Sequence, residues 1–319
     1  MNPFKKLIEP RLPGAAVGIS DDGLGVVTLE RRRDLFAVRR AGYTSLPEGL
    51  IRPHFDEPNI TDTAELAGIM AELVTSTGML KRHRWSAALP ELATRTTVIT
   101  LEGVPNGRGE LEEMLKWKTE RALGAPPADL RVARERLRPD AQGRARYLIS
   151  AMRLSVLAEY EAVFAGLGWH TGLILPRHMG EASWLMRDGA FPTDALLVSA
   201  FNEGFTAVLL RGTQPLLVRN VQCDEEDRHD ELYRLILFYR DRIAQASGAE
   251  GGAPTETIER LLVTGSGFDA RSASAIIEET LSVAPRMLRA EDVRLALPSP
   301  DLDFSLLAAP TGVAALAWN

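Results

Sequence analysis

The sequence predicts an α/β protein of two lobes, with a smaller α/β unit inserted between them along the chain. Its 319 residues are 45% apolar, which is enough to build two ordinary hydrophobic cores. Two hairpins of similar construction, over 16–29 and 196–210, open the two halves of the chain. Strand and helix patterns alternate between 85 and 168, which predicts the inserted unit.

Each hairpin consists of two apolar strands joined by a short polar turn that contains a glycine. The first turn reads Ser20-Asp21-Asp22-Gly23, and the second reads Phe201-Asn202-Glu203-Gly204. Glycine at these places is typical of a β-hairpin. Serine stands near the end of the first strand in both, as Ser20 and Ser199.

Helices are predicted where apolar residues recur every three or four positions, and strands where β-branched residues cluster. A capping-box pattern over 62–65 begins the first helix, and Gly78 ends it. The proline- and glycine-rich stretch 124–143 is predicted to be a loop. The elements expected up to residue 168 are helices 62–77, 110–123 and 156–167, and strands 96–101 and 146–151.

The second half repeats this alternation. It predicts a long amphipathic helix over 229–246, a flexible break over 248–254, a strand over 260–264 and a helix over 270–281. We therefore expect a first lobe of residues 1–84, completed by a C-terminal helix at about 305–319. The inserted unit takes 85–168 and the second lobe 169–304.

Composition argues against several classes of function. The 37 basic and 43 acidic residues give a net charge of −6, which does not suit a nucleic-acid surface. Cys223 is the only cysteine, so no internal disulfide forms and a reducing compartment fits. No apolar run approaches the roughly 20 residues of a membrane span, so we expect a soluble, cytosolic protein.

Neither metal nor hydrolase chemistry has a recognisable motif here. The acidic run 223–231 offers ligand atoms, but they are contiguous, and acids before a helix complement its positive end. The five histidines form no H-E-x-x-H pair, and G-x-S-x-G and Walker patterns are absent. We assign no catalytic residue and no metal ligand.

The turn Gly265-Ser266-Gly267 between a strand and a helix allows several interpretations. A dinucleotide fingerprint with Glu291 as the ribose ligand is disfavoured, because too little chain follows to complete such a sheet. Glycines that let the backbone approach a bound nucleoside are a second interpretation. A tight strand-to-helix turn without a ligand is the third.

The order of these features resembles the PilM family of type IV pilus assembly proteins, relatives of FtsA in the actin-like ATPase superfamily. The resemblance spans nearly the whole chain. The cytoplasmic domain of the type II secretion protein GspL is similar in fold, so a GspL-like component of a secretion system stays open as an alternative. The segments that carry it include 17–19, 45–51, 87–90, 113–118, 211–212 and 263–267, together with the small-residue tail.

This resemblance implies an actin-like, ribonuclease H-like duplicated core with an inserted small subdomain. It also implies a protein at the cytoplasmic face of the inner membrane that binds the N-terminal peptide of a PilN-like membrane protein and couples the pilus motor ATPase to the assembly platform. We expect the peptide groove between the first lobe and the inserted unit, near Leu89, Pro90 and Val98.

The chain departs from the family in both phosphate loops. The family's Asp-Ile-Gly-Ser corresponds here to Ser20, Asp21, Asp22 and Gly23, and the second loop has Ser199 and Phe201 for Asp and Gly. Serine lacks the charge that organises Mg²⁺, and Asp22 would place an anion beside phosphates. Any degenerate nucleotide site would comprise Gly18, Ser20, Asp21, Asp22, Ser199, Gly265, Ser266 and Gly267.

Two hypotheses follow. In the first, the chain is a scaffold that kept the fold, binds no cofactor and lost the ATPase activity. In the second, it is a working ATPase in which Asp21 and Asp22 hold Mg²⁺ for ATP. The fold alone does not choose between them.

Overall fold

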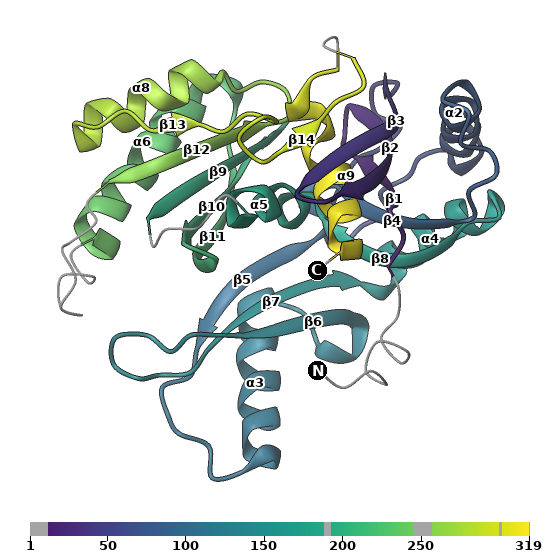
Figure 1. Ribbon diagram of the computed structural model, residues 1–319. Helices are drawn as coiled ribbons and strands as arrows, with labels where there is room; N and C mark the ends of the chain where they lie inside the picture. Colours follow the sequence, from purple (N-terminus) through teal and green to yellow (C-terminus); the bar gives the residue numbers. More distant parts are fainter. Residues whose placement is uncertain (1–11, 188–192, 245–256, 300–301, 319) are drawn as a thin grey trace.

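The computed structural model describes residues 12–187, 193–244, 257–299 and 302–318. The chain forms two sheet-containing lobes with a third, smaller sheet beneath them (Figure 1). The predicted break over 248–254 lies outside the described residues.

The first lobe is built on a six-stranded sheet with the strand order β14-β3-β2-β1-β4-β8. Strands β1 to β3 form an antiparallel meander, and β4 and β8 continue the sheet in parallel to β1. The strands are β1 (Ala15–Ile19), β2 (Gly23–Arg32), β3 (Leu35–Ser45), β4 (Arg84–Leu89), β8 (His170–Pro176) and β14 (Leu295–Ala296).

Helices cover both faces of this sheet because its strands are apolar on both sides. Helices α2 (Thr63–Ser76) and α4 (Leu154–Gly166) bury one face through residues such as Met70 and Tyr160. Helix α9 (Phe304–Ala315) buries the other face. The Asp62 carboxylate caps α2 by accepting from the backbone N–H of Ala64 and of Glu65, each at 2.9 Å, as predicted.

The second lobe is built on a five-stranded sheet with the order β11-β10-β9-β12-β13. Helices α6 (Arg228–Phe238) and α8 (Ala270–Leu281) bury one face of it. Helix α5 (Arg177–Arg187) lies between the lobes and packs against α9 and β9. The strands are β9 (Asp194–Phe201), β10 (Gly204–Arg211), β11 (Gln214–Gln222), β12 (Ile258–Thr264) and β13 (Arg286–Met287).

The inserted unit is a three-stranded antiparallel sheet, β5 (Arg95–Thr100), β7 (Arg146–Arg153) and β6 (Leu130–Leu137). Helix α3 (Arg108–Leu123) covers one of its faces and lies below the two lobes in Figure 1. The predicted range 85–168 is too wide, because β4 is a strand of the first sheet and α4 packs in the first-lobe core.

The prediction of a loop over 124–143 is wrong in its middle part, because this segment contains β6. Five of the eight residues of β6 are exposed and four are charged, so its apolar pattern is weak. Pairing along its whole length with β7 forms the strand instead. Among the described residues, no helix is long and apolar enough to cross a membrane.

Candidate functional site: the inter-lobe cleft and the β8 groove

The two hairpin turns face each other across the junction of the lobes. Strands β1, β4 and β8 run in parallel and so do β9 and β12, so each lobe directs its strand ends to this junction. The residues that follow these strands are therefore the candidate site. They are Ser20 to Asp22, Glu91, Arg177 and His178 from the first half, and Asn202 and Ser266 from the second.

Both aspartates of the first turn are hydrogen-bonded to the second lobe. The Asp21 carboxylate accepts from the backbone N–H of Asn202 at 2.8 Å, and the Asp22 carboxylate accepts from the Ser266 hydroxyl. The Ser20 hydroxyl donates to the other Asp22 oxygen at 2.8 Å. Burial raises the pKa of Asp21, and the bond from Asn202 opposes that increase. The turns that would flank a nucleotide thus bind each other directly.

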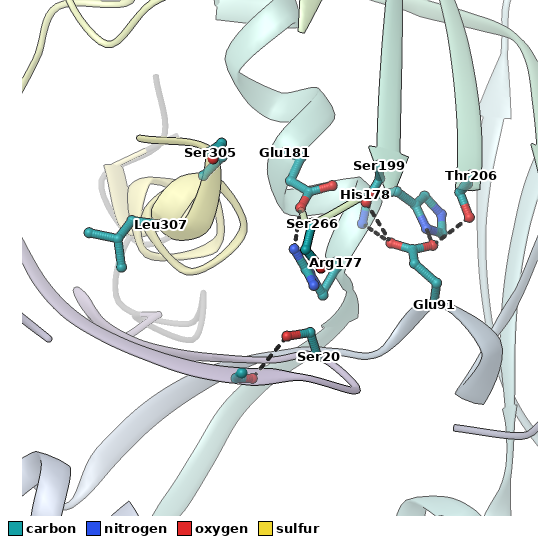
Figure 2. A network of polar contacts seen from close by, with 12 residues as sticks. Ser20, Glu91, Arg177, His178, Glu181, Ser199, Thr206, Ser266, Ser305 and Leu307 are labelled. Atoms are coloured by element: carbon teal, nitrogen blue, oxygen red, sulfur yellow. Dashed lines mark hydrogen bonds and ion pairs between the residues drawn. The ribbon is translucent and has the colours of Figure 1, made fainter. Parts of the chain in front are cut away.

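Arg177 places a buried cation between the lobes. Its side chain is 7% exposed and its guanidinium lies 3.2 Å from the carboxylate of Glu181, which is 0% exposed. Figure 2 shows this guanidinium below Glu181, on the side of Ser20. Burial alone would lower the pKa of Arg177, but the charges of Glu181, Glu91, Asp22 and Asp21 raise it overall. Arg177 therefore neutralises carboxylates contributed by several elements.

Glu91 accepts hydrogen bonds from both lobes. Its carboxylate accepts from the backbone N–H of His178 at 2.8 Å and faces the Nδ1 atom of that residue at 2.6 Å. The hydroxyls of Thr206 and Ser199, in the second lobe, donate to it at 2.8 Å and 3.3 Å (Figure 2). Burial would raise the pKa of Glu91, but His178, the Thr206 hydroxyl and the charge of Arg177 lower it overall. The ionised carboxylate is thus fully satisfied by protein groups.

A small and a large cavity lie at the junction of the turns. The cavity lined by Gly18, Ser20, Asp22, Gly265 and Ser266 has a volume of about 10 Å³, about what one water molecule requires. A larger cavity of about 710 Å³ opens in front of Asp21. Carboxylates outnumber cations along its walls, which is unfavourable for a polyphosphate. Its charged lining residues are Asp21, Glu48, Glu57, Glu91 and Glu203, with Arg52 and Arg177.

The glycines of the third turn are required by close contacts within the protein. Gly265 has φ +79°, and a Cβ there would lie 2.1 Å from the carbonyl oxygen of Ala200. Gly267 has φ +82°, and a Cβ there would meet the Arg228 guanidinium, which donates to the Gly267 carbonyl. Arg228 also donates to the carbonyls of Phe201 and Asn202. These contacts favour the interpretation as a tight turn without a ligand.

The structure brings most of the predicted nucleotide-site residues together. Gly18, Ser20, Asp22, Gly265 and Ser266 line one small cavity, and Asp21 lies beside it. Ser199 instead donates to Glu91, and Gly267 contacts Arg228. Sequence reasoning missed Glu91, Arg177 and His178. The signal for them was available, since Leu89-Pro90-Glu91 and Leu175-Pro176-Arg177 each end an apolar strand with proline and a charged residue.

A second concave region, which we call the β8 groove, lies between the first lobe and the inserted unit. Its volume is about 320 Å³, and it is lined by Thr171 to Pro176 of β8, with residues of β6, β7 and α4. Strand β8 is the outer strand of its sheet, so one of its edges faces the groove without a partner strand among the described residues. The apolar lining residues include Val132, Met152, Leu157, Leu173 and Ile174.

The predicted groove residues do not line this region. Leu89 is 0% exposed inside the first-lobe core, Pro90 is buried, and Val98 is half-buried against the core cluster that joins the lobes. Leu89 ends the inner strand β4, which pairs with β1 and β8, so neither backbone edge of β4 is open, and the Leu89 side chain packs in the first-lobe core. The expected location between the first lobe and the inserted unit contains a groove, but β8 supplies its residues.

Comparison with known proteins identifies the fold. No protein-family model and no curated protein matches the sequence. The structure is similar to a chain of the PilM–PilN type IV pilus biogenesis complex, with a TM-score of 0.71, 18% identity, and coverage of 97% of this chain and 100% of that chain. The chain has the actin-like fold that its sequence predicts.

Two further solved structures are similar over most of the chain. One is the cytoplasmic domain of EpsL, an inner-membrane component of the type II secretion system of Vibrio cholerae, with a TM-score of 0.47, 11% identity, and coverage of 95% and 93%. The other is a protein of actin-like ATPase fold from Bacteroides thetaiotaomicron, with a TM-score of 0.45, 12% identity, and coverage of 97% and 98%.

Proposed function

We propose that this chain is a scaffold of a type IV pilus assembly platform and binds the N-terminal peptide of a PilN-like membrane protein in the β8 groove. The observation that carries this proposal is the groove along the free edge of β8, in a chain similar over 97% of its length to a chain of the PilM–PilN complex. The scaffold lies at the cytoplasmic face of the inner membrane, where its membrane partner holds it. A pilus motor ATPase is a further expected partner.

The groove suits an extended peptide. Strand β8 hydrogen-bonds to β4 along one edge, so the other edge offers N–H and C=O groups to an added strand. Main-chain hydrogen bonds of this kind give affinity, and pockets that accept every second side chain of the peptide give specificity. The walls are mainly apolar, and Arg131 and Glu161 provide one charge of each sign.

The inter-lobe cleft supports a scaffold with little or no ATPase activity. Asp21 and Asp22, the residues that an active enzyme would use for Mg²⁺, already accept hydrogen bonds from Asn202 and Ser266. The buried Arg177 supplies positive charge where a metal ion would otherwise be needed. An ATPase would have to break these contacts before binding a metal ion and a triphosphate.

Calorimetry with a synthetic peptide of the partner's cytoplasmic tail tests the peptide site. We expect micromolar binding, and we expect Leu173→Asp to weaken it at least tenfold by placing a charge in the groove. Leu281→Asp is the matched control, because Leu281 is also half-buried but lies at the end of α8 in the second lobe. Equal affinity of the parent and the folded Leu173→Asp protein would show that the peptide binds elsewhere.

A further inference from the structure

The turn between α2 and β4 presents a leucine and basic side chains on the surface of the first lobe. Leu80 lies at its tip and is 61% exposed, more than any other leucine of the described residues. The exposed residues that follow it are Lys81, Arg82, His83 and Arg84. Arg40 of β3 and His170 of β8 lie beside this turn. We call residues 80–84, together with Arg40 and His170, the α2–β4 patch.

Hydrogen bonds at both ends hold this turn in one shape. Helix α2 ends in a Schellman motif, in which Gly78 has φ +70° and the N–H of Met79 donates back to the helix at 2.8 Å. The Met79 side chain, 2% exposed, is anchored in the first-lobe core. The Arg82 N–H donates to the Met79 carbonyl at 2.9 Å, and the buried Trp85 indole donates to the Arg82 carbonyl at 3.0 Å. Leu80 lies between these fixed points, so its side chain is held outward.

Three cations of the α2–β4 patch lack a counterion among the described residues. No described residue forms a hydrogen bond or an ion pair with the side chain of Arg40, Lys81 or Arg82. The Arg40 guanidinium lies beside Gly78, where a Cβ would be 2.7 Å from its Nη1 atom, so β3 adds its charge to that of the turn. In a chain of net charge −6, these side chains form a local excess of positive charge that attracts anionic surfaces.

The α2–β4 patch lies at the edge of the first lobe opposite the inter-lobe cleft. Strands β4 and β8 end at the cleft, so the residues that precede these strands lie at the other end. Helices α2 and α4, which lead into these strands, lie on the side of the first lobe away from the second lobe (Figure 1). The His170 N–H donates to the His83 carbonyl at 2.6 Å, and the next residue, Thr171, lines the β8 groove. The patch therefore adjoins one end of the groove.

The shape and chemistry of the α2–β4 patch suit a planar anionic surface. Residues 79–84 line neither the β8 groove nor the cavities of the cleft, so the patch is a protruding turn rather than a pocket. Cations around an apolar tip match the interface of a bilayer, where phosphates lie beside the outer ends of acyl chains. A small anion would gain nothing from the exposed Leu80.

We infer that the α2–β4 patch binds the surface of an anionic phospholipid bilayer. A bilayer is the expected partner because the proposed function, on which this step rests, places the chain beside the inner membrane. Lys81, Arg82 and Arg40 contact lipid phosphates, and Leu80 enters the interface between headgroups. One apolar side chain and a few cations bind only weakly, so this contact orients a protein that its partner peptide holds. A peptide that leaves the bilayer at this edge reaches the adjoining end of the β8 groove directly.

Co-sedimentation of the full-length protein with lipid vesicles, without the partner peptide, tests this inference. We expect binding to vesicles that contain phosphatidylglycerol at low salt, weaker binding at high salt, and no binding to vesicles of phosphatidylcholine alone. Lys81→Glu/Arg82→Glu should weaken the binding at least tenfold. Arg219→Glu/Arg271→Glu is the matched control, because both arginines are exposed in the second lobe and the net charge changes equally. This control should bind the vesicles as the parent does.

The same variants separate lipid binding from peptide binding. Leu173→Asp, in the β8 groove, should bind the vesicles as the parent does, and Lys81→Glu/Arg82→Glu should keep the parent's affinity for the partner peptide in solution. No binding to phosphatidylglycerol vesicles at low salt, or equal losses in the two double variants, would overturn the inference. Binding to polyglutamate but not to the vesicles would assign the patch to an acidic protein and would also overturn it. Each of these results leaves the peptide site of the β8 groove in place.

Discussion

The inter-lobe cleft and the β8 groove are both junctions between parts of this fold, but they differ in how their polar groups are satisfied. In the cleft, Asp21, Asp22, Glu91 and Arg177 bind partners on neighbouring elements, and the charged residues that line its larger cavity, of about 710 Å³, are mainly carboxylates. In the groove, a space of about 320 Å³ with a mainly apolar lining lies beside an edge of β8 that pairs with no other strand of the described residues. The cleft is therefore built to hold the lobes together, whereas the groove is built to receive another chain.

The largest expected effect comes from removing the buried cation of the cleft. Arg177→Ala should lower the free energy of unfolding by about 3–5 kcal/mol, because it leaves Glu181 buried without its partner. Chemical denaturation of the parent and the variant measures the loss. The double variant Arg177→Met/Glu181→Leu should lose much less, since it removes both charges. A loss below about 1 kcal/mol for Arg177→Ala would mean that the cation does not hold the cleft.

The next effect concerns the groove and changes binding rather than folding. Leu173→Asp should weaken binding of the partner peptide at least tenfold, which corresponds to about 1.4 kcal/mol of binding free energy. Leu281→Asp should keep the affinity of the parent protein. Thermal unfolding of both proteins provides the folding control. If the control variant loses affinity equally, the groove has no special role in binding.

A smaller effect follows from the raised pKa of Asp21. A carboxyl whose pKa is raised on folding favours the folded state when protonated, and this contribution is lost as the pH rises through the folded pKa. Asp21→Asn cannot ionise, and its amide oxygen can still accept from Asn202. The variant should therefore be as stable as the parent at pH 7, or more stable by up to about 0.5 kcal/mol.

The pH dependence provides the check on this prediction. The difference in unfolding free energy between Asp21→Asn and the parent should grow in favour of the variant from about pH 4 upward, and then level off above the raised pKa. A difference that does not change with pH, or one that turns against the variant at neutral pH, would contradict the burial effect at Asp21.

Local sequence signals were sufficient for most elements of the fold. The two hairpins, the Asp62 cap and the helix end at Gly124, which has φ +67°, depend on residues close together in the chain. Strand β6 could not be predicted in this way, because its side chains are largely polar and long-range pairing with β7 forms it. Leu89 was misplaced because the pairing of β4 on both sides is also a long-range property.

The candidate site also combines features that local sequence predicts with features that depend on long-range contacts. The altered turns at Ser20 and Phe201 could be read from the sequence, but their direct contact through Asp21 and Asn202 joins residues 181 positions apart. Glu91 and His178 lie 87 positions apart, and neither belongs to a recognisable motif. Only the arrangement of parallel strands shows that the residues after β4 and β8 meet the second lobe.

Calorimetric titration of one protein sample with Mg-ATP, and of another with the partner peptide, tests the central claim most directly. We predict micromolar binding of the peptide and no measurable binding of Mg-ATP, with a melting temperature that millimolar Mg-ATP leaves unchanged, because a ligand that does not bind the folded state cannot stabilise it. Tight binding of Mg-ATP that Asp21→Ala abolishes would contradict the account and would identify the cleft as a working nucleotide site.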